Sequence, residues 1–199
     1  MTESSLTQFW KVARCYSGSD ERSPDLTGPK DELPPAWSFG DTPEMADRLL
    51  ALVLAGQKTA TTGLYQEYVD DGESLPHVGE LSIILDGDGL PQALVREADI
   101  VVTRFGDITP QQAAAEGEGD QTLESWRASH RAFFESRGHI IDDDSPVVWE
   151  RFEVLYPRPQ KTDDGKRQSR RQAVEESRGT FSGVYPPDYL VELRDDWPA

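Results

Sequence analysis

A lysine followed by three threonines stands where it could bind an anion or activate a hydroxyl group. Residues 56–65 read GQKTATTGLY, in which Lys58 precedes Thr61 and Thr62. A turn here would expose backbone N–H groups beside the ammonium, an arrangement that binds phosphate. As a neutral amine in a cleft, Lys58 could instead take the proton of Thr61 or Thr62 and make a nucleophile. The segment has no Walker pattern, and a plain polar turn after a helix is the structural alternative.

A second candidate is the acidic, glycine-rich sequence AAAEGEGDQTLESWRASH at residues 113–130. Glu116 and Glu118 alternate with glycines, and a backbone without Cβ atoms lets a ligand approach closely. The alternative is structural: Gly117 ends one helix and a threonine caps the next. The carboxylates could hold a hard cation such as Mg²⁺, but their spacing matches no metal motif. We therefore expect neither a metal nor a cofactor.

An aromatic pair, Trp37 and Phe39, precedes the clearest helix in the chain. Such residues form either a hydrophobic staple in the core or a platform on which a base stacks. The three histidines lack the helical spacing and the cysteine neighbours of a zinc site. His130 shares a helix face with Trp126 and Phe134, which predicts a partly buried, hydrogen-bonded histidine.

Helices and strands that would position these residues follow from periodicity and capping signals. The helices are expected at residues 5–16, 43–56, 110–116 and 123–137, with Thr42 and Thr109 as caps. Strand-like runs are expected at residues 81–85, 93–105 and 147–156. The first two runs are joined by DGDGLP, whose Asp-Gly pairs are typical of a turn. This pattern predicts an α+β fold with a small, mostly antiparallel sheet or barrel and about three helices around it.

Length and charge limit the classes of function. The chain has 199 residues, with 20 Lys and Arg against 37 Asp and Glu, a net charge of -17. Such acidity disfavours coating of long duplex DNA, which binds proteins mainly through phosphate neutralisation. The longest apolar run has far fewer than the roughly 20 residues of a membrane span, and there is no leader pattern, so we expect a cytoplasmic protein without a membrane partner.

Three regions are predicted along the chain. Residues 1–36 form an N-terminal helix and loop, residues 37–156 form the main domain, and residues 157–199 follow it. Within the last region, residues 157–179 are polar and broken by Pro and Gly, as in a linker. The later residues regain aromatic and aliphatic side chains, which predicts a short docking segment.

Three separated motifs resemble the ASCH domain, the activating-signal-cointegrator homology domain of the PUA-like superfamily. They are WSFGDTPEMADRLLALVLAGQKTATT, LPHVGELSIILD and FGDITPQQAAAEGEGDQTLESWRASHRAFF, and the resemblance extends over residues 37–156. The combination of G-x-K-x-x-T with EGEGD-x-x-L-E-x-W-R-x-x-H is specific. The resemblance implies a small β-barrel with surrounding helices and a cleft for a nucleotide or an RNA strand.

The family resemblance also implies two activities. Some small bacterial ASCH proteins are amidohydrolases that deacetylate N4-acetylcytidine with a lysine, a threonine and a glutamate. By motif these become Lys58, Thr61 and Glu118 here, with Glu116 as a rival for the glutamate. Other ASCH proteins are ribonucleases on single-stranded RNA, in which the same lysine is implicated.

The resulting prediction is a hydrolase that acts on a modified nucleoside or nucleotide, with N4-acetylcytidine as the specific candidate. In this hypothesis Lys58 is the general base for Thr61 Oγ, which attacks the amide carbonyl. The alternative is a single-stranded RNA-binding module or a ribonuclease, in which Arg127 and other cations contact phosphates. The expected partner is a nucleoside or single-stranded RNA. Residues expected to bind it are Thr62, Phe39, Glu116, Trp126 and Arg127.

Overall fold

The computed structural model describes residues 4–17 and 33–157. The predicted linker and docking segment lie outside these residues. The elements, in chain order, are α1 (Ser5–Ser17), β1 (Ala36–Trp37), α2 (Pro43–Leu54), β2 (Ala60–Leu64), α3 (Tyr65–Asp71), β3 (Leu81–Leu85), β4 (Pro91–Arg104), the 3-10 helix η1 (Phe105–Asp107), α4 (Pro110–Ala115), α5 (Leu123–Ser136) and β5 (Pro146–Tyr156).

One five-stranded sheet forms the centre of the fold, in the order β1-β3-β4-β5-β2. Three of its four strand pairs are antiparallel and the β1–β3 pair is parallel. The α+β class and the mostly antiparallel pairing are therefore as predicted. The barrel is not confirmed, because β1 and β2 are the two edges of the sheet and are not paired in the described part of the chain. The described residues also form five α-helices rather than about three.

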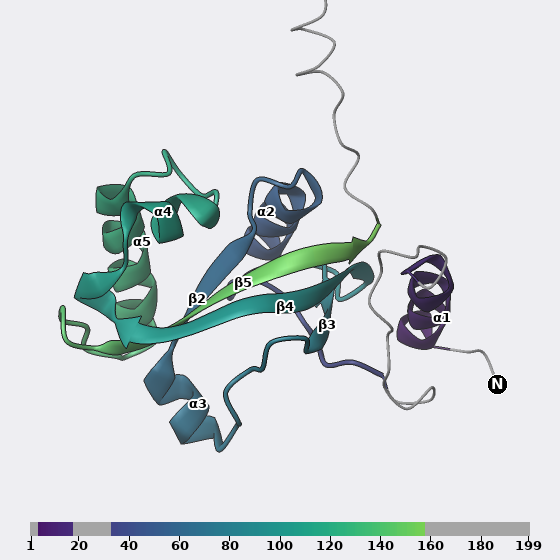
Figure 1. Ribbon diagram of the computed structural model, residues 1–199, viewed down its shortest axis with the longest axis horizontal. Coiled ribbons are helices and arrows are strands. Elements are labelled where there is room, and N and C mark those ends of the chain that lie inside the picture. Colours follow the sequence, from purple (N-terminus) through teal and green to yellow (C-terminus); the bar gives the residue numbers. More distant parts are fainter. Residues whose placement is uncertain (1–3, 18–32, 158–199) are drawn as a thin grey trace, which may run out of the picture. The chain divides into compact units, whose positions relative to one another are not determined.

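Two long strands, β4 and β5, run side by side through the middle of the molecule (Figure 1). Packed against the sheet are three groups of buried hydrophobic side chains. One group joins β2 and β5 to α4 and α5, and a second joins β3 and β4 to α2. The third places Trp10 and Ala13 of α1 against Ile83 and Leu94. The amphipathic N-terminal helix therefore covers part of the sheet, as its periodicity indicates.

Local signals account for the helix ends. Thr42 accepts a hydrogen bond from the Met45 amide, and Pro43 occupies the first turn of α2. Thr109 and Gln112 form a reciprocal capping box on α4. Such caps satisfy amide groups that have no partner inside the helix. The positions of the caps depend on residues that are neighbours in the sequence. The predicted helix starts at Pro43, Pro110 and Leu123 therefore agree with the structure.

One segment differs from its predicted form. Residues after Lys58 were expected to make a turn, but Ala60–Leu64 is the edge strand β2, paired with β5. Alternate β2 residues are buried, and the intervening Thr61 and Gly63 are half-buried. Two adjacent threonines hid this alternation, because both are polar while they point to opposite faces of the strand.

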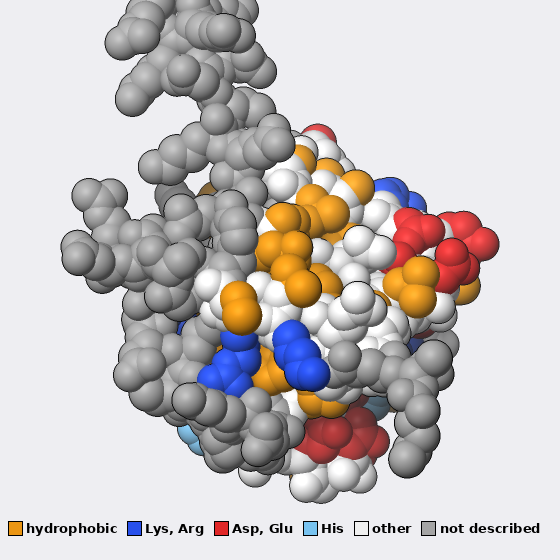
Figure 2. All heavy atoms as spheres, turned by 90° about the vertical axis from the view of Figure 1, so that its right-hand side faces the viewer, with side chains coloured by type: hydrophobic (Ala, Val, Ile, Leu, Met, Phe, Trp, Pro, Cys, Tyr) orange, Lys and Arg blue, Asp and Glu red, His pale blue; other side chains and the backbone are white. Residues whose placement is uncertain are grey.

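One face of the molecule carries hydrophobic side chains beside charged ones (Figure 2). On the face shown in Figure 2, hydrophobic side chains extend across the middle and acidic side chains gather in distinct groups. In the described part of the chain, no helix has both the length and the apolar character needed to cross a bilayer.

Candidate functional site

Lys58 is placed by the end of α2. The amides of Gln57 and Lys58 both donate to the Leu52 carbonyl, at 2.9 and 3.0 Å, so the chain leaves the helix in a defined direction. Thr59 is held in turn by α4, because its amide and its hydroxyl both donate to the Ala115 carbonyl. The lysine therefore lies between two anchored segments, and its side chain is only 1% exposed.

Two carboxylates from the acidic segment meet the Lys58 ammonium. Glu118 Oε1 lies 2.7 Å from Nζ and Glu116 Oε2 lies 3.5 Å from it. The shorter distance is that of a charge-assisted hydrogen bond. The ring centroid of Phe39 lies 5.3 Å from the same Nζ, within the range of a cation–π contact. The two motifs that sequence analysis singled out are therefore in direct contact.

Glu116 is the centre of a buried polar network. Its Oε1 accepts hydrogen bonds of 2.6 Å from the Thr62 hydroxyl and from the Trp126 indole. Its Oε2 lies 3.2 Å from His130 Nε2. Burial alone would raise the pKa of Glu116, but His130, Lys58 and the Thr62 hydrogen bond outweigh it and lower the pKa to about 2. Glu116 is therefore a carboxylate at neutral pH.

The acidic segment approaches Lys58 through Gly117. This residue follows α4 with φ of 69°, and an added Cβ would clash with the backbone of Gln57. Gln57 Nε2 also donates to the Gly117 carbonyl at 3.2 Å. Gly117 therefore has the structural role that ends the helix, and the space beside it is occupied by the Gln57 backbone instead of a ligand. Thr122 caps α5 by accepting from the Ser125 amide.

A small cavity of about 80 Å³ opens beside these groups, and we call it the Lys58 cavity. Its lining includes six predicted residues, namely Phe39, Lys58, Thr61, Thr62, Glu116 and Glu118. Trp126 holds Glu116 in place through the hydrogen bond that its indole N–H donates. Arg127 is directed elsewhere, because its guanidinium donates to the Gly106 carbonyl at 2.7 Å. Arg127 is not among the residues that line the cavity.

Thr61 and Thr62 occupy opposite faces of β2. Thr62 lies across from Trp149 on β5, whereas Thr61 lies across from Glu150. Neighbouring residues of a strand point to opposite faces, so only the Thr62 hydroxyl joins the Glu116 network. Thr61 shares its face with Glu150 and also lines a second, larger cavity of about 670 Å³. Both cavities therefore use β2 as a wall.

Four site residues were not predicted as such from the sequence. His130 was expected to be partly buried and hydrogen-bonded, which it is, but its contact with Glu116 was not foreseen. Tyr68, Glu97 and Glu150 line the larger cavity. The available signal was the presence of glutamates inside the apolar strand sequences ALVREADIVV and VVWERFEV. Within the described residues, no three His, Cys, Asp or Glu side chains are grouped so that they could hold a metal ion.

Comparison with known proteins identifies the family. A family model described as ASCH domain matches residues 35–156, more than half of the chain, and the chain belongs to this family. No curated protein matched. Protein EF3133 from Enterococcus faecalis V583 is similar in structure, with a TM-score of 0.63 and 30% identity over 75% of this chain and 87% of that one. An ASCH domain from Lactobacillus crispatus JV V101 has a TM-score of 0.63 and 26% identity, over 78% of this chain and 98% of the other.

Proposed function

We propose that this ASCH domain is a hydrolase that removes an acyl group from the exocyclic amine of a modified cytidine, with N4-acetylcytidine as the substrate. The observation that carries the proposal is the 2.7 Å contact between Lys58 and Glu118 on the wall of the cavity that Thr61 and Thr62 also line. A lysine, hydroxyl groups and a carboxylate thereby share one partly enclosed space. This is the set of groups that acyl transfer to a hydroxyl requires.

The reaction begins with a proton transfer. Lys58 Nζ can act on a threonine hydroxyl only as a free amine, and its hydrogen bond to Glu118 Oε1 provides a route for the proton it must lose. Glu118 is 28% exposed and can pass that proton to solvent, whereas Glu116 is 1% exposed and holds its charge. The two carboxylates therefore have different tasks.

Hydrolysis then takes place in two stages. The threonine oxygen attacks the amide carbonyl carbon, and the hydroxyl proton goes to Lys58. The C–N bond breaks, and the proton passes to the leaving amine to give cytidine. Water attacks the acyl-threonine, releases acetate and restores the hydroxyl group. Phe39 and Glu116 shape and orient the site, and Trp126 holds Glu116 in place through its indole N–H.

Two threonines, Thr61 and Thr62, are candidates for the nucleophile. Thr61 follows from the family motif, but Thr62 is the residue whose hydroxyl lies in the Lys58 network. Substitution of each by Val removes the hydroxyl while the β-branched shape is kept, and substitution by Ser retains the hydroxyl. The test is acetate release from N4-acetylcytidine by purified protein. With Thr61 as nucleophile, Thr61→Val abolishes release, Thr61→Ser retains part of it, and Thr62→Val lowers it less.

A binding module without turnover is the second candidate. It is favoured by the same contact, because a lysine that is hydrogen-bonded to one carboxylate and close to another already has ionic partners and can serve to position a ligand. A module would bind single-stranded RNA with strong salt dependence and yield neither acetate nor cleaved RNA. Unchanged acetate release in both Val variants would overturn the hydrolase mechanism through either threonine. RNA cleavage that requires Lys58 would instead identify a ribonuclease.

A further inference from the structure

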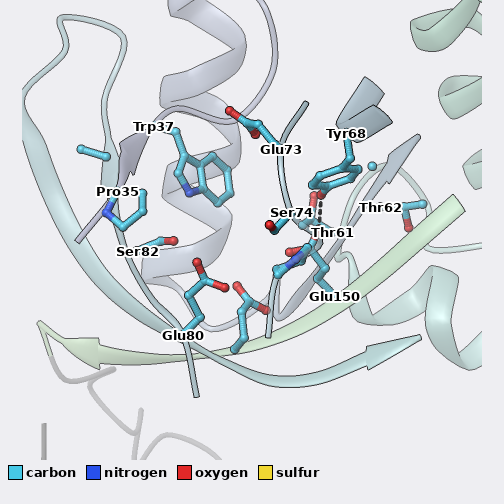
Figure 3. Close-up of a pocket in the computed structure, with 14 residues that line it drawn as sticks. Pro35, Trp37, Thr61, Thr62, Tyr68, Glu73, Ser74, Glu80, Ser82 and Glu150 are labelled. Carbon is cyan, nitrogen blue, oxygen red and sulfur yellow. Dashed lines mark hydrogen bonds between the residues drawn. The ribbon is translucent and has the colours of Figure 1, made fainter. Parts of the chain in front are cut away.

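The larger cavity, which we call the Glu97 cavity, has the size of a binding site for a nucleoside. Its volume is about 670 Å³, within the range of small-molecule pockets. Figure 3 shows Trp37 and Tyr68 on opposite sides of it, with Glu80 below Trp37 and Glu150 below Tyr68. Residues that line it come from five strands, from α3 and from the segment that follows α3.

The charged groups of this cavity all have one sign. Four glutamates line it, Glu73, Glu80, Glu97 and Glu150, and neither Lys nor Arg occurs among its described lining residues. The cavity therefore attracts positive charge and repels phosphate. Two of the carboxyl groups, those of Glu97 and Glu150, are 4% and 7% exposed. Both cost free energy when ionised, because water cannot solvate them fully.

Glu97 has an unused hydrogen-bonding position. Its Oε2 is buried and has no hydrogen-bond partner among the described residues. By contrast, Glu150 Oε1 accepts a hydrogen bond of 2.8 Å from the Tyr68 hydroxyl. A buried polar atom without a partner destabilises the free protein, and a ligand that supplies an N–H donor removes this cost. A cavity lined by Glu97 is thus incomplete without a donor group.

The pKa values of the two buried carboxyl groups are raised, as expected where carboxyl groups have no cationic partner. Burial, with Glu150 and Glu80 nearby, raises the pKa of Glu97 to about 8. Burial also raises the pKa of Glu150 to about 6, although the Tyr68 hydrogen bond opposes this and Glu80 adds to it. Burial and Glu150 likewise raise the pKa of Tyr68, so this phenol stays a donor. A cation that enters would stabilise the carboxylate forms and displace the proton of Glu97.

We propose that the Glu97 cavity selects a planar, positively charged nitrogen heterocycle, such as an N-methylated nucleobase, through the Glu97 and Glu150 carboxylates and the faces of Trp37 and Tyr68. Aromatic faces attract cations, and a flat delocalised cation contacts both a ring and a carboxylate. The inference goes beyond the proposed function, because N4-acetylcytidine is uncharged and the Glu97 cavity is a second site, separate from the Lys58 cavity. It adds a preference for positive charge that the Lys58 cavity, with its own ammonium, does not provide.

The test compares two nucleosides that differ in charge. Binding of 3-methylcytidine, whose ring is positively charged at pH 7, and of neutral cytidine is measured by titration calorimetry on the full chain. We expect the cation to bind at least about tenfold more tightly, to release protons on binding, and to bind more tightly at pH 7.5 than at pH 6.0. Equal affinities, no binding of 3-methylcytidine, or an affinity independent of pH would each overturn the inference.

Variants identify the groups responsible. Glu97→Gln keeps the shape of the side chain but removes the charge, and it should lower the affinity for 3-methylcytidine about tenfold with little effect on cytidine. Glu80→Gln, at the more exposed side of the cavity, should have the same direction with a smaller effect. Glu135→Gln, an exposed position on α5, is the control and should change nothing. An affinity unchanged in Glu97→Gln would contradict the proposal.

Acetate release from N4-acetylcytidine, measured on the same preparations, separates this inference from the proposed function. If the protein releases acetate but binds both nucleosides equally, the cation preference is overturned and the hydrolase proposal stands. If it binds 3-methylcytidine preferentially but releases no acetate, the hydrolase proposal is overturned and the cation site stands.

Discussion

Lys58 Nζ lies 2.7 Å from Glu118 Oε1, although 60 residues separate them in the sequence. The contact joins the segment after α2 to the segment between α4 and α5. Because the ammonium is buried, it depends on these carboxylates for the interactions that water would supply. The same pair therefore contributes to the stability of the domain as well as to its proposed chemistry.

Lys58→Met should destabilise the protein strongly. The substitution keeps most of the packing volume but removes the cation that contacts Glu118 and leaves Glu116 with His130 alone as an ionic partner among the described residues. Breaking a buried ion pair typically costs about 3 kcal/mol. Urea unfolding at pH 7 measures this loss. Arg104→Met is the control, because Arg104 pairs with Asp107 at an exposed position and such pairs contribute little. Similar losses in the two variants would show that the Lys58 pair is energetically ordinary.

Stability should fall at acid pH because of Glu116. The folded-state pKa is about 2, below the ordinary value of 4.5, so ionisation of Glu116 favours folding. This contribution is fully present above about pH 4.5 and is lost as the pH falls toward 2. Glu116→Gln should therefore cost about 3 kcal/mol at pH 7 and much less near pH 2. A loss of stability that is the same at both pH values would contradict the assignment.

Glu97 should have the opposite effect on the pH dependence. The folded-state pKa is about 8, above the ordinary 4.5, so the folded protein keeps a proton that the unfolded chain has lost. Its unfavourable effect is absent below pH 4.5 and grows as the pH rises toward 8. Between pH 5 and pH 8, the stability of Glu97→Gln relative to the wild type should rise by about 3 kcal/mol. Thermal or urea unfolding at the two pH values measures this, and parallel curves would count against a buried acid.

Gly117→Ala should be more damaging than Gly72→Ala. Both glycines have nearly the same positive φ, 69° and 67°, so the backbone strain of an alanine is the same at both. A methyl group at Gly72 meets nothing within 4 Å, whereas at Gly117 it meets the backbone of Gln57. We expect a loss of about 1 kcal/mol for Gly72→Ala from strain alone, and at least about 3 kcal/mol for Gly117→Ala. Equal losses would show that strain alone decides both.

The parts of the fold that sequence analysis predicted correctly depend on local chemistry. The start of α2 follows from Thr42 and Pro43, and the strand Leu81–Leu85 follows from a short apolar run. The ASCH family followed from three motifs together. The expected barrel is not confirmed in the described residues, because strand periodicity indicates which residues pair but not whether the two edges of the sheet meet.

The site was predicted in part. The sequence identified Lys58, Glu116 and Glu118, because lysine and acidic residues next to glycines do not fit the apolar pattern of a buried helix or strand. Glu97 and Glu150 could not be named. An acidic residue within a predicted strand is assigned to the solvent face when the neighbouring strands are unknown. Their burial depends on the β4–β5 register and on α3, neither of which the sequence displays.

The end of α2 has a consequence for how this segment can change in length. The Leu52 carbonyl accepts hydrogen bonds from the amides of Gln57 and Lys58, and Ala60, three residues after Gln57, is already paired with Arg151 of β5. One residue inserted between Lys58 and Thr61 would shift β2 by one position against β5, so that Thr61 and Thr62 would exchange faces of the strand. Homologous chains should therefore vary in length at the β3–β4 turn or after α3, and hold this stretch to a constant count.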